Sequence, residues 1–142
     1  MDDYQSLSHT RWECKYHVVL VPKCRRQVLY GQITKDLGKQ LAELARQRES
    51  RIETGSFQPD HIHMVMVIPP KYAVSEVVGR MKGITASRLR KRYEWLKRPY
   101  WKENVVWSEG YFVSTIGIDE DKILKYVKWQ GRQDSGQAKL EL

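Results

Sequence analysis

Cysteine is scarce in this 142-residue sequence, and long apolar runs are absent from it. The two cysteines, Cys14 and Cys24, do not have the spacing of a zinc or redox motif, so we expect free thiols in a reducing, cytoplasmic compartment. No stretch of eighteen apolar residues occurs, and residues 1–10 hold no apolar segment, so we expect neither a membrane span nor a secretory signal. A G-x-x-x-x-G-K-S/T phosphate loop is also missing, which argues against a nucleotide cofactor.

Acidic residues are outnumbered by basic ones. The 25 Lys and Arg residues against 17 Asp and Glu give a net charge of +8, which predicts a polyanionic partner. Basic residues gather at 80–98, where Glu94 is the single acid, and again at 23–26. Either these groups are solvated faces or they contact nucleic acid. The expected contacts are Lys23, Arg25, Arg26, Arg80, Lys82, Arg88, Arg90, Lys91 and Arg92.

The apolar pattern predicts one α+β domain over residues 1–142, with a frayed polar tail at 131–142. Strands are expected at 11–21, 51–57, 61–68 and 105–116, with Gly110 as a bulge or close-approach point. Helices follow the first and third strands, and another follows the fourth; their expected N-caps are Thr34, Ser75 and Asp119. This order is the ferredoxin-like or RRM-like βαββαβ antiparallel sheet, with helices on one face and an additional C-terminal helix ending near Gln130. RNA-recognition domains share this plan, so the fold alone does not choose a function.

His61 and His63 stand two apart in the third expected strand, so their side chains project from the same face. Two imidazoles on one side of a sheet form half of a metal site, although such a pair can also be satisfied by polar neighbours. Both faces of this strand are apolar, which predicts an internal strand with half-buried histidines that need partners. His9 and His17 lack a partner at ligand spacing, so we expect them to be structural.

Tyr126 and Gln130 lie four apart on one stripe of the last helix, with Ile123 and Val127, which predicts that this stripe docks on the domain. Either Tyr126 is a core aromatic and Gln130 a surface amide, or the amide oxygen completes a His, His, Gln set suited to Mg²⁺ or Mn²⁺. A phenol, with a pKa of about 10, is a weak nucleophile that such a metal would assist. Its attack on a phosphodiester would leave a phosphotyrosine and a free 3′ hydroxyl, and reversal would rejoin DNA without ATP.

Several motifs, in order along nearly the whole chain, resemble the single-tyrosine HUH transposases of the smallest bacterial insertion sequences. The matching segments are residues 16–19 with the basic residues at 23–26, then 59–63, 68–72, 75–79, 81–83 and 107–117, and finally the Tyr-x-x-x-Gln helix. The resemblance implies a DNA transposase that cuts and rejoins single-stranded DNA. It places the nucleophile on Tyr126 and the metal ligands on His61, His63 and Gln130.

The resemblance also implies a homodimer that recognises hairpins at the ends of the element, in the cytoplasm of a prokaryote and at its nucleoid. The tyrosine helix would enter the partner's active site, and the basic residues would contact hairpin phosphates. Trp129 is bulkier than the residue expected before Gln130 and would pack at the dimer interface or under the metal site. The aromatic residues that either stack on bases or pack in the core or interface are Tyr93, Trp95, Tyr100, Trp101 and Trp107.

Two other functions compete with the transposase. A non-catalytic module that binds single-stranded nucleic acid on the same fold would keep the basic and aromatic residues but have no use for the metal set. A replication-initiation or relaxase nuclease would use the same chemistry, but those proteins are generally longer than this chain.

Overall fold

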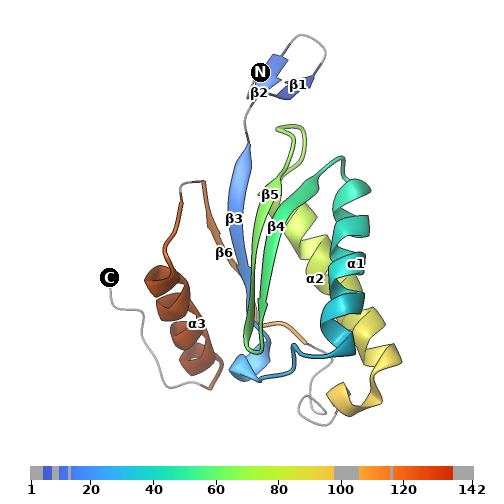
Figure 1. The fold of residues 1–142 in the computed structure, drawn as a ribbon, viewed down its shortest axis with the longest axis vertical. Helices are drawn as coiled ribbons and strands as arrows, with labels where there is room; N and C mark the ends of the chain where they lie inside the picture. Colours follow the sequence, from blue (N-terminus) through green and yellow to red (C-terminus); the bar gives the residue numbers. More distant parts are fainter. Residues whose placement is uncertain (1–4, 8–9, 13, 98–105, 116, 136–142) are drawn as a thin grey trace.

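The structure, a computed structural model, describes residues 5–7, 10–12, 14–97, 106–115 and 117–135 (Figure 1). Its elements in chain order are β1 (Gln5–Leu7), β2 (Thr10–Trp12), β3 (Lys15–Leu20), the 3₁₀ turn η1 (Lys23–Arg25), α1 (Gln32–Arg46), β4 (Arg51–Gln58), β5 (His61–Val67), α2 (Val74–Arg92), η2 (Glu94–Lys97), β6 (Phe112–Ser114) and α3 (Glu120–Asp134). Four strands form an antiparallel sheet in the order β4-β5-β3-β6, and β1 pairs with β2 in a separate hairpin. The predicted α+β, ferredoxin-like arrangement is confirmed.

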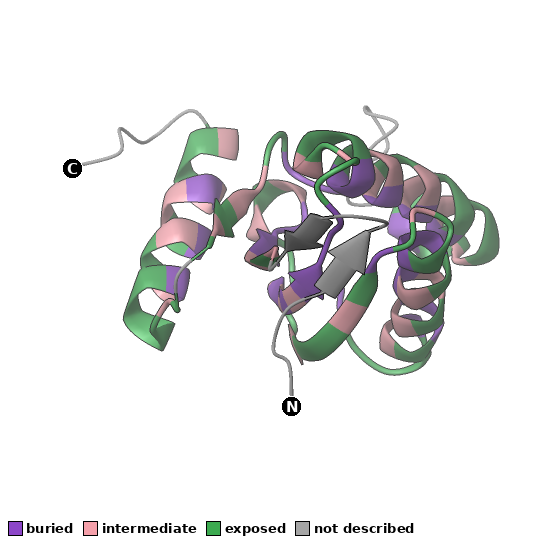
Figure 2. Ribbon diagram, turned by 90° about the horizontal axis from the view of Figure 1, so that it is seen from above, coloured by how far each residue is buried: buried purple, intermediate pink, exposed green. Residues whose placement is uncertain are grey.

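Helices α1 and α2 cover one face of the sheet, and α3 lies on the opposite side (Figures 1 and 2). Alternate residues of the two internal strands point to the two faces. Those that pack under α1 and α2 in the main core are Val18, Leu20, Ile62, Met64 and Met66. A smaller cluster joins Val19 and Val21 of the β3 segment to Ile123 and Val127 of α3. His61 and His63 alternate with the core residues of β5, so they occupy the face on the α3 side.

The helix starts depart from the predicted caps at two of three places. Gly31 precedes α1 with a φ of 61°, and Thr34 lies inside the helix, where its hydroxyl donates to the Gly31 carbonyl at 2.7 Å. Helix α2 begins after Ala73, so Ser75 is likewise internal. Asp119 is the cap as predicted, because its Oδ1 accepts from the Lys122 N–H at 2.8 Å.

Two of the predicted strands are shorter than expected. The strand expected at 11–21 divides into β2 and β3, and the β1–β2 hairpin was not predicted. Of the strand expected at 105–116, only Phe112–Ser114 is a strand among the described residues. Trp107 makes an isolated bridge to Pro22. Gly110 separates these two parts with a φ of 74°, a backbone conformation that glycine adopts without a Cβ clash.

Helix α3 continues to Asp134, so the prediction of a frayed tail from residue 131 is wrong for 131–134. The reason is the Asp134 carboxylate, which is only 4% exposed. It accepts hydrogen bonds from the Cys24 N–H at 2.9 Å and from the Ser108 hydroxyl, and Lys23 Nζ lies 3.7 Å away. These contacts bind the last turn of α3 to η1 and to the segment after α2. The rest of the predicted tail, 136–142, is outside the described residues.

The contact between α3 and η1 leaves no space for a side chain at Gly131. A Cβ there would lie 2.9 Å from Arg25 Cβ, so we expect Gly131→Ala to lower the free energy of unfolding by about 1–2 kcal/mol despite its better helix propensity. Gly83→Ala in α2 is the matched control, because nothing lies within 4 Å of its Cβ position, and it should raise stability by up to about 1 kcal/mol. Urea denaturation measures both changes. Equal stabilisation by the two alanines would contradict the packing of α3 on η1.

Candidate active site

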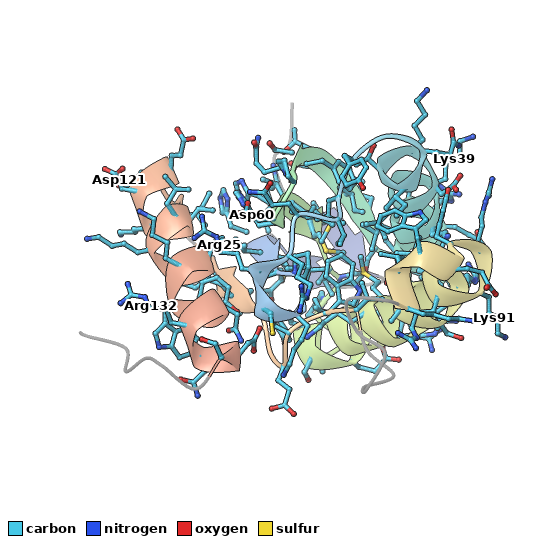
Figure 3. All side chains as sticks on the ribbon, turned by 90° about the horizontal axis from the view of Figure 1, so that it is seen from below. Arg25, Lys39, Asp60, Lys91, Asp121 and Arg132 are labelled. Carbon is cyan, nitrogen blue, oxygen red and sulfur yellow. The ribbon has the colours of Figure 1, made fainter. Side chains whose placement is uncertain are left out.

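His61 is held by a carboxylate at the start of β5. The residue is buried, with 7% of its surface exposed, and its Nδ1 lies 2.8 Å from Asp60 Oδ1. Because an ionised carboxylate only accepts, Nδ1 donates, and the lone pair of Nε2 remains for a ligand. Arg25 Nε donates to Asp60 Oδ2 at 2.8 Å, and both side chains lie in the space between α3 and the sheet (Figure 3). Burial opposes ionisation of Asp60, but the bonds from His61 and Arg25 outweigh it and hold the pKa of this carboxyl below its ordinary value.

His63 lies two residues further along the same face, and its partner is another histidine. His63 Nε2 is 3.1 Å from His17 Nδ1 on the adjacent strand β3. Burial, and then the charges that His17 and His61 would carry, lower the pKa of His63, which favours the neutral imidazole that binds metals. The prediction that His17 has no partner at ligand spacing is wrong.

Helix α3 presents Tyr126 and Gln130 on the docked stripe that the sequence predicted. Ile123 and Val127 are buried, and Gln130 is 4% exposed. Gln130 Nε2 donates to Asp134 Oδ1 at 3.2 Å, which assigns the amide nitrogen to that bond and leaves Oε1 as the possible ligand atom. Gln130 is therefore a buried amide and not a surface one.

Tyr126 is half-buried against two aromatic rings. The centroid of its ring lies 5.4 Å from that of Phe112 and 5.9 Å from that of Trp129. Burial, and then the negative charge of Asp134, raise the pKa of Tyr126 to about 12. The phenol is therefore neutral at physiological pH and would need help to act as a nucleophile. Trp129 packs on this ring, and its Nε1 is buried without a hydrogen-bond partner.

The donor set fits a divalent metal through histidine and amide ligands. Among the described residues, no group of three or more His, Cys, Asp or Glu side chains is placed to hold a metal ion. His61 nevertheless has the arrangement of a metal-ligating histidine, with one nitrogen bonded to a carboxylate and the other free. His63 is favoured in its neutral form, and Gln130 keeps an amide oxygen, so His61, His63 and Gln130 could hold Mg²⁺ or Mn²⁺.

Three of the expected DNA contacts bind groups of the chain itself. Lys23 faces Asp134, and Arg25 binds Asp60, as described above. Lys82 Nζ donates to the carbonyls of Ser108, at 2.7 Å, and Gly110, and burial lowers its pKa. These three cations hold separate segments of the chain together, which the density of basic residues along the sequence could not reveal.

The basic residues of α2 divide between its two sides. Those that face α1 have partners there, namely Arg80 with Gln47, Arg88 with Glu43 and Arg92 with Asp36. Lys91 lies at the outer edge of the helix layer (Figure 3), while Arg26 and Arg90 also have interaction partners. The positive patch is thus partly neutralised by α1.

Two cations of the tyrosine helix itself, Lys128 and Arg132, are absent from the DNA contacts that the sequence predicted. The η1–α3 pocket, of about 600 Å³, opens beside the contact between η1 and α3 and is lined by Arg25, Lys128, Arg132 and their neighbours. Lys128 and Arg132 are four apart and share one stripe of α3, which lies about 200° around the helix from the stripe of Tyr126 and Gln130. That helical spacing was the signal that could have found them.

The aromatic residues near the basic stretch have different environments. Trp107 is a core residue, 5% exposed, whose Nε1 donates to Thr85 Oγ1 at 3.1 Å. Trp95 is 40% exposed and stacks on Tyr30 with ring centroids 5.7 Å apart, so this ring is open to a base. The hydroxyl of Tyr93 donates to Asp36. Tyr100, Trp101 and His9 lie outside the described residues.

Cys14 and Cys24 are free thiols, as predicted. Within the described ranges, no helix combines the length and apolar character that crossing a membrane requires.

An H-x-H pair thus lies on an internal strand of a ferredoxin-like sheet, and the helix that carries Tyr126 packs on the same face. The chain belongs to the IS200-like transposase family, whose sequence profile matches residues 10–130. It is 39% identical over 142 residues to the transposase of insertion sequence IS200 from Salmonella typhimurium, covering all of this chain and 93% of that protein. The ISDra2 transposase TnpA of Deinococcus radiodurans is 30% identical over 120 residues, which cover 84% of this chain and 85% of that protein.

Solved structures agree on the fold. A crystal structure of a protein from Deinococcus radiodurans R1 described as a transposase superposes with a TM-score of 0.78 at 24% identity, over 89% of this chain and 97% of that one. A REP-associated tyrosine transposase bound to a REP hairpin gives a TM-score of 0.54 at 14% identity, over 94% of this chain and 76% of that one. At these identities the likeness concerns the fold.

Proposed function

We propose that this transposase cuts and rejoins single-stranded DNA at insertion-sequence ends through a covalent 5′-phosphotyrosine, with a divalent metal and without ATP. The observation that carries the proposal is the arrangement of α3, whose stripe bearing Tyr126 and Gln130 packs on the sheet face that carries His61 and His63. Nucleophile and candidate ligands thus belong to one layer of the domain. If Tyr126 were only a core aromatic and Gln130 only a surface amide, the two would not need to face the histidines of β5.

The proposed step exchanges one phosphodiester for another. Tyr126 Oη forms a bond to phosphorus, the bond between phosphorus and the 3′ oxygen breaks, and the phenolic proton ends on that oxygen. The DNA keeps a free 3′ hydroxyl, and attack by such a hydroxyl on the phosphotyrosine reverses the exchange. Because no bond energy is lost to hydrolysis, no nucleotide is needed.

His61, His63 and the Gln130 amide oxygen would hold the metal. When bound there, Mg²⁺ or Mn²⁺ supplies positive charge for the phosphate oxygens and favours tyrosinate over phenol. Asp60 keeps the His61 proton on Nδ1, and Arg25 keeps Asp60 ionised. Asp134 accepts a hydrogen bond from the amide nitrogen of Gln130, so the Gln130 Oε1 atom points away from Asp134. The protein's part is to fix these donors before the metal arrives.

The proposed substrate is a single strand whose end folds into a hairpin. A relative of the same fold has been solved with a REP hairpin, and the net charge of +8 suits a polyanion. Lys128 and Arg132 in the η1–α3 pocket are cations that we assign to phosphates of the DNA strand. The chain is also proposed to act as a homodimer in a prokaryotic cytoplasm, as the resemblance implies.

Removal of the metal tests the proposal directly. The full-length protein should cleave a single-stranded oligonucleotide carrying its hairpin end in Mg²⁺ or Mn²⁺, and lose cleavage in EDTA while keeping most of its hairpin affinity. Denaturing gels and band shifts measure the two quantities. Equal binding of RNA and DNA with no cleavage in any metal would instead support a non-catalytic binding module.

The η1–α3 pocket makes a prediction about salt dependence. Replacing both Lys128 and Arg132 with alanine should weaken binding of single-stranded DNA and reduce the slope of log K against log salt by about 1.4, since each phosphate contact contributes about 0.7. Lys39→Ala is the control, because Lys39 is exposed on α1 and far from α3 (Figure 3). An unchanged slope in the double variant would remove these residues from the DNA path.

A further inference from the structure

A third histidine, His17, bonds to the metal-site pair across the sheet. In the antiparallel register His17 is opposite Val65 and Val19 is opposite His63, so His17 and His63 are diagonal neighbours on the α3 side. Their nearest nitrogens, His17 Nδ1 and His63 Nε2, are 3.1 Å apart. The ring centroids are 5.4 Å apart and the ring planes differ by 16°. The centroid separation nearly equals the nitrogen separation plus the two ring radii, so the two nitrogens point at each other.

This geometry determines which ring nitrogen of each histidine is left to bind a metal. A hydrogen bond between two neutral imidazoles needs one N–H and one lone pair. The nitrogen of His63 that meets His17 is Nε2, so Nδ1 is the nitrogen left over. His61 has the reverse arrangement, in which Asp60 engages Nδ1 and leaves Nε2. Each candidate ligand therefore has one nitrogen held by a neighbour and one free, as metal-ligating histidines usually do.

We propose that His17 is a positioning residue of the metal site, which accepts the Nε2 proton of His63 and thereby holds Nδ1 of His63 free for the metal. The inference rests on the proposed metal-dependent function. His17 would play for His63 the part that Asp60 plays for His61. Its own proton is then on Nε2.

Two other roles for His17 fit the geometry less well. As a direct ligand, its Nδ1 would have to aim with His63 at a common point, whereas the two nitrogens aim at each other. As a competitor of the metal, it would occupy the ligating nitrogen of His63, and its removal would strengthen metal binding. Removing a competitor would strengthen metal binding, which is the opposite of the result expected for the proposed role. Removing a direct ligand would also weaken metal binding, so that role is distinguished by which nitrogen of His63 carries the proton.

The test is Mn²⁺ binding to the full-length protein by isothermal titration calorimetry. We expect His17→Ala to weaken Mn²⁺ affinity by about 10–100-fold, the usual effect of losing an outer partner of a metal-ligating histidine. His17→Asn should restore affinity to within a few fold of the native protein, because its Oδ1 can accept from His63 Nε2. Unchanged or tighter binding by His17→Ala would overturn the proposal, and so would an asparagine variant as weak as the alanine variant.

A second measurement needs no substitution. Nitrogen-15 NMR of the metal-free protein should show the His63 imidazole protonated on Nε2, and a neutral His63 protonated on Nδ1 would overturn the proposal even if His17→Ala failed to fold. Thermal unfolding of the metal-free variants separates lost ligand geometry from lost structure. A native protein that binds no Mn²⁺ would count against the proposed function, whereas native binding that His17→Ala leaves intact counts against His17 alone.

Discussion

Tyr126→Phe should abolish strand cleavage and covalent attachment while hairpin binding and folding persist. The substitution removes one oxygen and keeps the ring that packs between Phe112 and Trp129. Because that oxygen is the proposed nucleophile, the rate should fall by roughly 10⁴-fold or more, which is background in a cleavage gel. The assay uses end-labelled single-stranded DNA with Mg²⁺, resolved in denaturing gels that also display the protein–DNA adduct.

The matched control for this substitution is Tyr111→Phe. Tyr111 is also partly buried, although it packs against the main core and not against the α3 cluster, and burial raises its pKa as it does that of Tyr126. Cleavage by Tyr111→Phe at the native rate would assign the effect to Tyr126 alone. If Tyr126→Phe still cleaves, or if both variants lose cleavage equally, Tyr126 is not the nucleophile.

His61→Ala should be as inactive as Tyr126→Phe but for a different reason. It removes the imidazole bonded to Asp60 and with it a ligand, so Mn²⁺ affinity should fall below detection by calorimetry even though Tyr126 is intact. Asp60→Asn is the graded comparison, because its amide oxygen still accepts from His61 but carries no charge, and an intermediate affinity is expected. Native Mn²⁺ affinity in His61→Ala would exclude His61 as a ligand.

A mixture of these two inactive proteins examines the proposed dimer. If each active site combines α3 of one chain with the histidines of the other, a mixture of His61→Ala and Tyr126→Phe chains should recover part of the native cleavage. In the single chain described here, α3 packs on its own sheet through Val127 and is bound to η1 through Asp134. An inactive mixture in which both variants are dimeric would show that α3 and the histidines of the same chain form each active site.

The parts of the site that the sequence could predict are those set by local periodicity. Alternation along 61–67 assigned His61 and His63 to one face, and the four-residue step assigned Tyr126 and Gln130 to one helical stripe. The ferredoxin-like order followed from the same two periods. Each inference needed only neighbours in the chain.

The parts that could not be predicted depend on contacts between distant segments. The partner of His63 is 46 residues away and is set by the register of β3 on β5. Asp134 looks like part of a solvated tail in the sequence, yet η1 buries it and extends α3 by a turn. The acids that pair with α2 come from α1, which no charge count along α2 could reveal.

The central claim is that Tyr126 joins covalently to DNA, and peptide mapping of the adduct tests it most directly. The native protein is incubated with its hairpin-ended single strand and Mg²⁺, digested with nuclease and trypsin, and analysed by mass spectrometry. We expect a nucleotide phosphate on the short tryptic peptide Tyr126–Lys128, which lies between Lys125 and Trp129. A phosphate on any other residue, or cleavage with no phosphotyrosine formed, would contradict it.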